Sequence, residues 1–585
     1  MNINDIHSPA DIKKLGVDEL RQVAADIRTA LITKLSRTGG HVGPNLGMVE
    51  ATIALHYVFD SPKDKIVFDV SHQCYTHKML TGRVQAFLDP VHYHDVTGYT
   101  EPRESDHDFF TVGHTSTSVS LACGLAKARD LKGGDENIIA VIGDGSLSGG
   151  EAFEGLDAAA ELHSNFIVVV NDNDMAIAEN HGGLYDDLRR LRETNGTSDT
   201  NYFRSLGYDY RFVPMGNDLL SLIDVFRDVR GSGKPVVVHI VTEKGEGYKP
   251  AEEDKEKWHY EGPFEVPSGI VLSDLHPVEN FCDLTCGFLL EKMKKNPTVV
   301  TITSATPTVM GFTRDKREEA GDRFVDVGIA EEHAAAFSSG LAKAGMNPVW
   351  GVWATFVQRA YDQISQDICI NGNPATILVF GGGGETMTDV THLCWFDIAM
   401  LSNIPGLLYL APADRREYLA MADWAIKQRE WPVAVRVPAQ KVFDFDYELD
   451  TNYADVNTSQ QIVSGKGLAI ISVGNMLART LEAVELLKKD GITPTVINAR
   501  FLNEVDKELL SSLSPDHNAV LTVEDGIIDG GYGQKVASFY ADTPMLVRNL
   551  GLPKEFHDRY DVTALMDRCH LTPAGIAAQA REMFK

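Results

Sequence analysis

Long apolar runs are missing from the sequence, and their absence excludes one class of protein. The most apolar stretches, at 138–143 (IIAVIG) and 166–171 (FIVVVN), are far shorter than the roughly 20 residues that span a bilayer. The opening stretch MNINDIHSPADIKKLG also lacks the basic segment and apolar core of a signal peptide. We therefore expect a cytoplasmic protein without a membrane partner.

Positive charge is scarce as well. The chain has 54 Lys and Arg against 83 Asp and Glu, which gives a formal net charge of −29. A nucleic-acid backbone would be repelled by most of such a surface, so general nucleic-acid binding is excluded. A small anionic ligand is not excluded, because it needs only a local pocket of donors.

Cysteine is sparse and scattered. The 7 cysteines show no disulfide-framework spacing. Cys282 and Cys286 form a close pair, but no second Cys/His pair with zinc-site spacing accompanies them. We expect reduced, structural thiols.

The length of 585 residues exceeds what one core supports and suggests three or four domains. Two composition shifts mark joints: the charged, Pro-containing stretch 249–269 and the polar stretch 444–466. We therefore expect three domains, at 1–270, 277–450 and 460–585.

Short β-branched runs alternate with longer amphipathic stretches through all three domains. This alternation is typical of α/β layers around mainly parallel sheets. The predicted strands lie at 65–70, 138–142, 166–170, 235–241, 298–303, 324–329, 348–352, 376–380, 432–436 and 468–473.

The most informative segment is 137–179. One predicted strand ends in the triplet GDG around Asp144, and the next ends in the triplet NDN that closes with Asn173. In a parallel sheet both ends meet at the carboxyl edge, where ligands bind. Asp144 and Asn173 offer the oxygen ligands that Mg²⁺ prefers, and Gly143 and Gly145 allow the backbone to approach phosphates closely. GDG alone would indicate only a tight turn, but GDG followed by NDN is typical of thiamine diphosphate enzymes.

Further motifs resemble one branch of those enzymes, the 1-deoxy-D-xylulose 5-phosphate synthase family. The likeness covers nearly the whole chain, and its segments at 69–83 and 111–118 are highly specific. The segments that carry it are GGHVGPNLGMVEATIALHYVFDSP (39–62), DVSHQCYTHKMLTGR (69–83), TVGHTSTS (111–118), TEKGEGYKPAE (242–252), IAEEH (329–333), ATFVQRAYDQ (354–363), and the C-terminal VEDG, GGYG and NLGLP.

The resemblance implies the fold, the cofactors and their ligands. It implies two thiamine diphosphate-binding parallel-sheet domains followed by a transketolase C-terminal-type α/β domain, with thiamine diphosphate and Mg²⁺ as cofactors. The implied metal ligands are Asp144, Asn173 and the carbonyl of Met175. The implied diphosphate-binding residues are His72, Gly113, His114, Thr115, Gly145, Ser146, Asn173 and Tyr248.

The resemblance also implies the catalytic carboxyl group. Glu331 matches the glutamate that protonates the aminopyrimidine ring, and Phe356 matches the aromatic residue that stacks on that ring. A plain reading of Glu331 is an acidic residue favoured at a helix N-terminus. Glu332 lies about 100° further around that helix and should not share the role. Since Glu331 belongs to the second domain, the resemblance implies an active site between the first and second domains.

At the substrate end the resemblance assigns His41, Arg359 and His392 to the reaction pocket or to proton transfer, for which histidine suits neutral pH. This chain departs from the family there. Trp353 replaces a tyrosine, and the two arginines that grip the acceptor's phosphate are replaced by Gly381 and Ala439. Arg436, Lys441 or a nest of backbone N–H groups in the glycine run 381–384 are alternative phosphate donors. The segment 186–199 is also shorter than the family's mobile insertion.

Two enzymatic readings stand. The first is decarboxylation of pyruvate and transfer of the acetyl carbanion to an aldehyde, which is either glyceraldehyde 3-phosphate, as in the family, or a different aldehyde in this chain. The alternative is transketolase-type transfer of a two-carbon ketol unit from a ketose donor, which releases no carbon dioxide. A pyruvate dehydrogenase-like component and a non-catalytic cofactor-binding paralogue rank below both. The partners are thus small molecules, and the family implies a homodimer, leaving open whether the site lies within one chain or between subunits.

Overall fold

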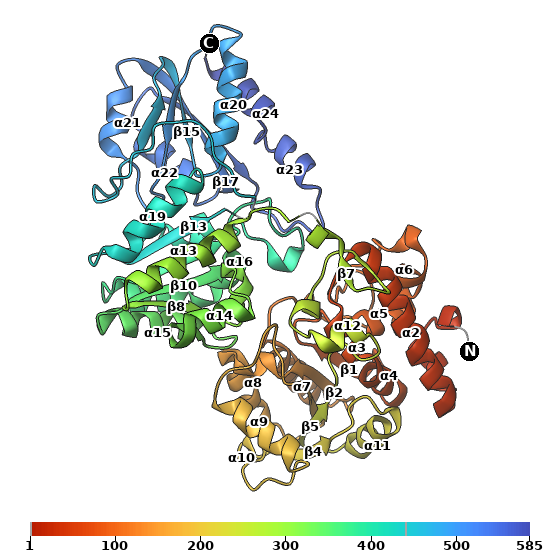
Figure 1. The fold of residues 1–585 in the computed structure, drawn as a ribbon. Helices are drawn as coiled ribbons and strands as arrows, with labels where there is room; N and C mark the ends of the chain where they lie inside the picture. Colours follow the sequence, from red (N-terminus) through yellow and green to blue (C-terminus); the bar gives the residue numbers. More distant parts are fainter. Residues whose placement is uncertain (1–2, 276, 439–440, 585) are drawn as a thin grey trace. The chain divides into compact units, whose positions relative to one another are not determined.

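The computed structural model describes residues 3–275, 277–438 and 441–584. It consists of two compact units, one ending at residue 277 and including 328–330, the other comprising 278–327 and 331–585 (Figure 1). Ala439, where the second arginine is replaced, lies outside the described residues.

The first unit is built around a five-stranded, wholly parallel sheet in the order β1-β2-β3-β5-β4. Apolar side chains bury both of its faces, as a parallel sheet requires. One face packs against α2, α4 and α11, the other against α7, α8 and α9. The strands are β1 (Lys65–Phe68), β2 (Ile138–Gly143), β3 (Phe166–Asp172), β4 (Asp209–Val213) and β5 (Pro235–Val241); the helices are α2 (Val17–Thr38), α4 (Val49–Val58), α7 (Ser118–Lys132), α8 (Gly150–Ala160), α9 (Gly183–Glu193) and α11 (Leu219–Val229).

The second unit contains two sheets. Its first is six-stranded and wholly parallel, in the order β12-β13-β11-β10-β8-β9. Helices α13 and α19 cover one face, while α15, α16 and α18 pack on the other. The strands are β8 (Val299–Thr303), β9 (Phe324–Asp326), β10 (Asn347–Trp353), β11 (Thr376–Phe380), β12 (Leu408–Leu410) and β13 (Val433–Val437); the helices are α13 (Phe281–Lys295), α15 (Glu331–Lys343), α16 (Ala354–Val357), α18 (Asp397–Leu401) and α19 (Arg415–Lys427).

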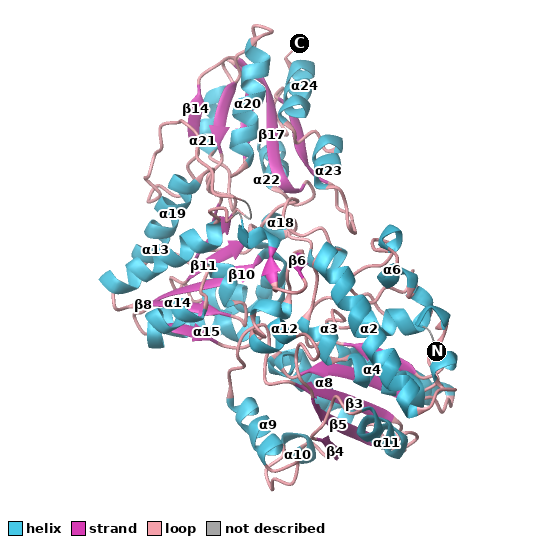
Figure 2. Cartoon of the chain, turned by 45° about the vertical axis from the view of Figure 1, so that its right-hand side comes forward, coloured by secondary structure: helices cyan, strands magenta, loops and turns pink. Residues whose placement is uncertain are grey.

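The last sheet has the order β14-β16-β15-β17-β18, and only its edge strand β14 runs antiparallel. Figures 1 and 2 show α20 and α24 on one side of this sheet and α21 and α22 on the other. The strands are β14 (Gln460–Val463), β15 (Gly467–Ser472), β16 (Thr495–Asn498), β17 (His517–Ile527) and β18 (Leu546–Leu552); the helices are α20 (Met476–Lys488), α21 (Lys507–Leu513), α22 (Tyr532–Phe539), α23 (Val562–Arg568) and α24 (Pro573–Met583).

The three α/β sheets, two wholly parallel and one mainly parallel, confirm the predicted fold class, and each strand named from the sequence is present. Two of them end two or more residues before the predicted end. Strand β1 ends at Phe68, because Val70 and Ser71 take positive φ angles of 57° and 62°. Strand β9 ends at Asp326, and Gly328 turns the chain with a φ of 76° before α15.

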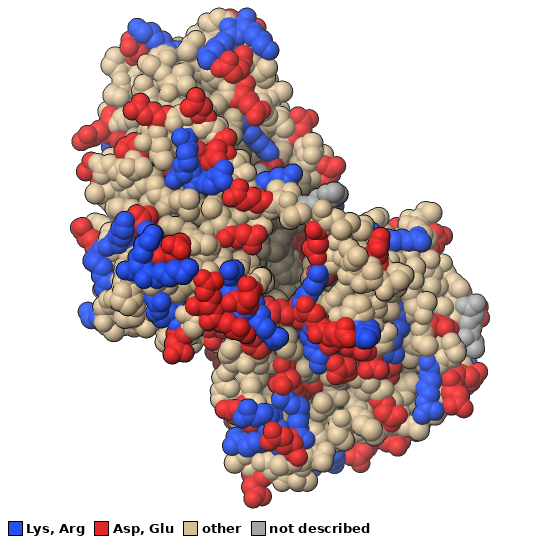
Figure 3. Space-filling model, in the orientation of Figure 1, with Lys and Arg blue, Asp and Glu red and all other residues tan. Residues whose placement is uncertain are grey.

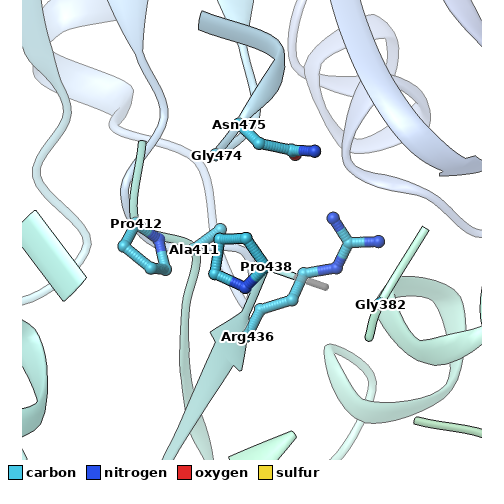
Figure 4. A pocket seen from close by; sticks show the side chains of 7 residues that line it. All are labelled: Gly382, Ala411, Pro412, Arg436, Pro438, Gly474 and Asn475. Atoms are coloured by element: carbon cyan, nitrogen blue, oxygen red, sulfur yellow. The ribbon is translucent and has the colours of Figure 1, made fainter. Parts of the chain in front are cut away.

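The two sheets of the second unit share one continuous apolar cluster, which includes Ile302 and Ile377 from one sheet and Ile471 and Val520 from the other. A buried charge lies at the same junction. The guanidinium of Arg436, which is 4% exposed, donates to Asp397 at 2.7 Å and also to Asp525. Figure 4 shows this guanidinium between Gly382 and Asn475, at a small cavity lined by both sheets' loops.

No described helix is long and apolar enough to cross a membrane. Figure 3 shows acidic side chains over the visible face of each unit, with Lys and Arg interspersed among them. The excess of negative charge is therefore dispersed rather than gathered in one patch of that face.

We predict that Arg436→Met lowers the free energy of unfolding by about 3–5 kcal/mol, because it leaves two buried carboxylates without their cation. Arg415→Met is the matched control. Arg415 also pairs with two carboxylates, Glu279 and Asp444, but at the surface, so the expected loss is about 1 kcal/mol or less. Urea unfolding followed by tryptophan fluorescence measures both, and equal midpoints for the two variants would contradict the prediction.

Candidate active site

The two sequence triplets GDG and NDN meet at the carboxyl edge of the first sheet. Strands β2 and β3 pair in parallel with Gly143 opposite Asn171, and the N–H of Asp144 donates to the carbonyl of Asn171 at 3.0 Å. Asp144 and Asn173 therefore follow directly from neighbouring strand ends. This is the edge at which parallel α/β sheets bind ligands.

The three residues of NDN differ in the hydrogen bonds that their side chains make. Thr242 donates to the side-chain oxygen of Asn171, and Asp172 accepts from Arg192 and contacts His239, each at 2.8 Å. Asn173 Oδ1, in contrast, is buried and has no hydrogen-bond partner. Burying a polar atom without a partner is costly. Asn173 is thus the member of the triplet whose oxygen a cation would satisfy.

Asp144 has the matching environment. It is buried, and Oδ2 accepts from the Met175 N–H at 3.0 Å and from Asn180 at 2.8 Å. Burial and the neighbouring Asp172 raise the pKa of Asp144, so its carboxylate form calls for a nearby positive charge. The described residues contain no cluster of three or more His, Cys, Asp or Glu that could hold a metal. One carboxylate with amide and backbone oxygens instead suits Mg²⁺, which keeps phosphate and water ligands.

The loop 111–118, which carries Gly113, His114 and Thr115, is fastened to the same edge. Asp69, at the end of β1, accepts from the N–H groups of Ser116 and Ser118 at 2.8 and 2.9 Å. The Ser116 hydroxyl then donates to the carbonyl of Ser146, one residue beyond Gly145. The structure therefore brings the predicted phosphate-binding loop against the GDG turn.

Three histidines cluster beside these loops. The His41 ring meets the edges of His72 and His259 with centroids 4.9 and 5.7 Å apart, and His72 stacks on His259 at 5.3 Å. The side-chain amide of Asn45 donates to the carbonyls of both His41 and His72. Two segments 31 residues apart in sequence are thereby held together, and His259 joins the predicted pair.

Sequence reasoning missed two further residues here. Lys244 is 2% exposed, and its ammonium donates to the carbonyl of Ala176 at 2.7 Å, beside the GDG turn. Burial lowers the pKa of Lys244 to about 7, which indicates that its charge lacks a full counter-ion. Tyr185, from α9, donates to the carbonyls of Asp144 and Gly145. The lysine lies in the quoted motif TEKGEGYKPAE, so its position was visible, whereas nothing in the sequence marked the tyrosine.

Tyr248, from the same motif, is placed differently. Its ring packs against Trp258 and Phe264, and its hydroxyl donates to the carbonyl of Val266 at 3.1 Å. The structure thus shows a packing role for Tyr248, and its predicted part in cofactor binding stays a prediction.

In the second unit the predicted residues gather at the carboxyl edge of the six-stranded sheet. Glu331 opens α15 and is 3% exposed; Arg359 lies 3.5 Å from its carboxylate. Burial raises the pKa of Glu331, and the arginine opposes that shift. The result is a carboxyl group inclined to hold a proton.

Phe356 and His392 face each other at the same edge. Phe356 lies on α16, just after β10, and its ring meets His392 edge-on at 5.7 Å. His392 Nδ1 lies 2.7 Å from the hydroxyl of Thr391, and burial lowers the pKa of His392 to about 4. The imidazole is therefore neutral near pH 7.

The segments around these two sites match sequence profiles of known domains. Residues 3–201 match the profile described as 1-deoxy-D-xylulose-5-phosphate synthase, 287–443 that of the transketolase pyrimidine-binding domain, and 458–576 that of the transketolase C-terminal domain. The fold and the two residue sets thus define a thiamine diphosphate-dependent transferase of the transketolase type.

Full-length relatives narrow this class. A 1-deoxy-D-xylulose-5-phosphate synthase of Symbiobacterium thermophilum is 38% identical over 100% of this chain and 95% of its own length. One from Geobacter sulfurreducens is 37% identical over 100% and 97%. The chain belongs to the 1-deoxy-D-xylulose-5-phosphate synthase family. A solved transketolase variant from Pichia stipitis is 17% identical over 97% of this chain and 98% of its own, with a TM-score of 0.45.

We predict that Lys244→Met weakens thiamine diphosphate binding roughly 10- to 100-fold, because a charge-assisted hydrogen bond contributes about 1.5–3 kcal/mol. Calorimetric titration of the cofactor in excess Mg²⁺ measures the dissociation constant. Lys255→Met is the matched control, since Lys255 lies just beyond the motif that contains Lys244 and pairs with Glu243. Equal affinities of the two variants would show that the Lys244 ammonium does not meet the diphosphate.

Proposed function

We propose that this chain decarboxylates pyruvate and joins the resulting two-carbon acyl unit to an aldehyde. The observation that carries the proposal is Glu331: a buried carboxyl group of raised pKa at the edge of a pyrimidine-binding-type sheet, in a full-length relative of the synthases. A buried carboxyl group of raised pKa suits acid catalysis at a ring nitrogen, because it holds its proton more firmly than an exposed carboxyl group does.

The metal and the diphosphate have overlapping sets of ligands in this proposal, and Asn173 belongs to both. Asp144, Asn173 and the carbonyl of Met175 hold Mg²⁺, supported by the partnerless oxygen of Asn173. Bound thiamine diphosphate supplies carbanion stabilisation. The diphosphate ligands proposed from the sequence are His72, Gly113, His114, Thr115, Gly145, Ser146, Asn173 and Tyr248.

The chain's own side chains perform the remaining steps. Glu331 would hold a proton toward the pyrimidine, Phe356 would stack on that ring, and Arg359 opposes the rise that burial causes in the pKa of Glu331. His392 is neutral, so it accepts a proton or a hydrogen bond from substrate rather than presenting a cation. We also assign a role in proton transfer to His41, because it matches the family's residue with that role.

We further propose a cytoplasmic homodimer with domains at 1–270, 277–450 and 460–585. Membership of the family supports the dimer, and the two polar joints support the boundaries. Light scattering on the purified protein should give twice the mass of 64.3 kDa, and the mass of a single chain would contradict the dimer.

We predict that Glu331→Gln lowers the rate of carbon dioxide release from carboxyl-labelled pyruvate by roughly 10²- to 10⁴-fold, since it removes the acid. The assay contains the cofactor, Mg²⁺ and an aldehyde. Glu332→Gln is the control, because it changes the adjacent carboxyl group on another face of α15 and should retain activity. Wild-type protein that binds the cofactor but releases no carbon dioxide, while transferring ketol units from a ketose, would favour the transketolase reading.

A further inference from the structure

The loop after β11 leaves no room for a side chain at its first position. Gly381 has a φ of 76°, and a Cβ there would lie 2.5 Å from the indole of Trp353 and 3.0 Å from the Thr386 methyl. A Cβ essentially never approaches a non-bonded heavy atom to less than about 3 Å. The indole therefore occupies the space into which any longer side chain at 381 would extend.

The backbone of this glycine run is also engaged. The N–H of Gly381 donates to the carbonyl of Val437, and that of Gly383 donates to the carbonyl of Cys394, both at 3.1 Å. A backbone nest binds an anion through successive N–H groups that point at it. With the first and third of these groups bonded to carbonyls, the run 381–384 does not form such a nest.

The nearest guanidinium is committed elsewhere. Arg436 is buried between Asp397 and Asp525, with two contacts to the former. Cβ atoms on Gly382 and Gly383 would lie 2.6 Å from Arg436 Nε and 2.2 Å from Asp525 Oδ2. The glycines thus pack directly on this ion cluster, whose two carboxylates outnumber its one cation. A phosphate brought to the loop would meet acidic groups, not a free guanidinium.

No contact in the structure supports Lys441 as a replacement for the two phosphate-binding arginines. It is exposed, and its backbone pairs with Asn280, the residue that caps α13 on one face of the sheet. The replacement at Ala439 adds no charge in any conformation.

We propose that the aldehyde acceptor of this chain carries no phosphate and lies with its uncharged tail against the Trp353 indole. This inference rests on the proposed function. In the reaction, pyruvate loses carbon dioxide, a bond forms between its carbonyl carbon and the aldehyde carbon, and the aldehyde oxygen takes up one proton. The product is an uncharged α-hydroxy methyl ketone rather than a sugar phosphate. The enzyme that consumes it therefore acts on a neutral ketone.

The test compares D-glyceraldehyde with D-glyceraldehyde 3-phosphate, which differ only in the phosphate. With wild-type holoenzyme and pyruvate, we expect kcat/KM for the unphosphorylated aldehyde to exceed that for the phosphate ester at least tenfold. The reverse preference would overturn the inference while leaving the proposed function intact. Release of carbon dioxide without any aldehyde measures the proposed function separately.

A binding measurement decides the inference even if pyruvate is not turned over. Glycerol 3-phosphate, an unreactive analogue, is titrated into holoenzyme by calorimetry, with inorganic phosphate as a second probe. We expect neither probe to give a saturable heat signal beyond the signal that glycerol, the unphosphorylated control, gives in the same titration. Saturable binding of glycerol 3-phosphate that glycerol does not show would overturn the inference.

A gain-of-function pair tests the position itself. Trp353→Ala/Gly381→Arg opens the occupied space and supplies a cation, and Trp353→Ala/Gly381→Met is the uncharged control of similar length. We expect the arginine variant to favour the phosphorylated aldehyde at least tenfold more than the methionine variant does. Equal preferences in two variants with wild-type circular dichroism would show that residue 381 does not face the acceptor's phosphate end.

Discussion

The parallel register of β2 and β3 is the constraint on which the candidate site of the first unit depends. Because Gly143 lies opposite Asn171, the chain leaves two neighbouring strands at the same edge and must place Asp144 and Asn173 there together. A shift of one residue would exchange Asn173 for Asp172, whose carboxylate is already bound to Arg192 and His239. The buried β-branched strands fix the register, and the register fixes which oxygen remains available to a cation.

The candidate site of the second unit depends on how buried charge is balanced. Glu331 has one arginine at 3.5 Å, which is too weak a pairing to offset its burial, so its pKa is raised. Arg436 has two carboxylates in close contact and is held firmly in its charged form. Both groups lie in the second unit, Glu331 at the start of α15 and Arg436 on β13, but the weakly paired carboxyl group is inclined to hold a proton while the tightly paired guanidinium stabilises the junction of two sheets. Burial alone therefore does not mark a catalytic residue; the quality of its pairing does.

Much of this arrangement could be predicted from the sequence, for a physical reason. Period and composition fix strands that are buried on both faces, so β2, β3 and β10 were predictable, and with them the edge of the first sheet that carries Asp144 and Asn173 and the edge of the six-stranded sheet that carries Phe356. Glu331 follows β9, a strand that was predicted but that ends earlier than expected. Tyr185 and His259 were not predictable, because neither follows a strand end. Tyr185 lies on α9, and His259 lies in the short helix Lys257–His259. Tyr248 shows the converse limit: its motif was recognisable, but the motif does not state which way the ring points.

Trp353 and Gly381 show why substitutions should be considered in contacting pairs. In the sequence they lie 28 residues apart and look like two independent departures from a family pattern. In the structure the indole fills the volume above the glycine, so a change at one residue affects the other. A longer side chain at 381 would collide with the ring, and a smaller ring at 353 would leave a void above the glycine. The ion cluster behind Gly382 and Gly383 extends the same restriction along the loop. The loss of positive charge at this edge is therefore built into the packing, which is the expected form of a change in what the pocket accepts.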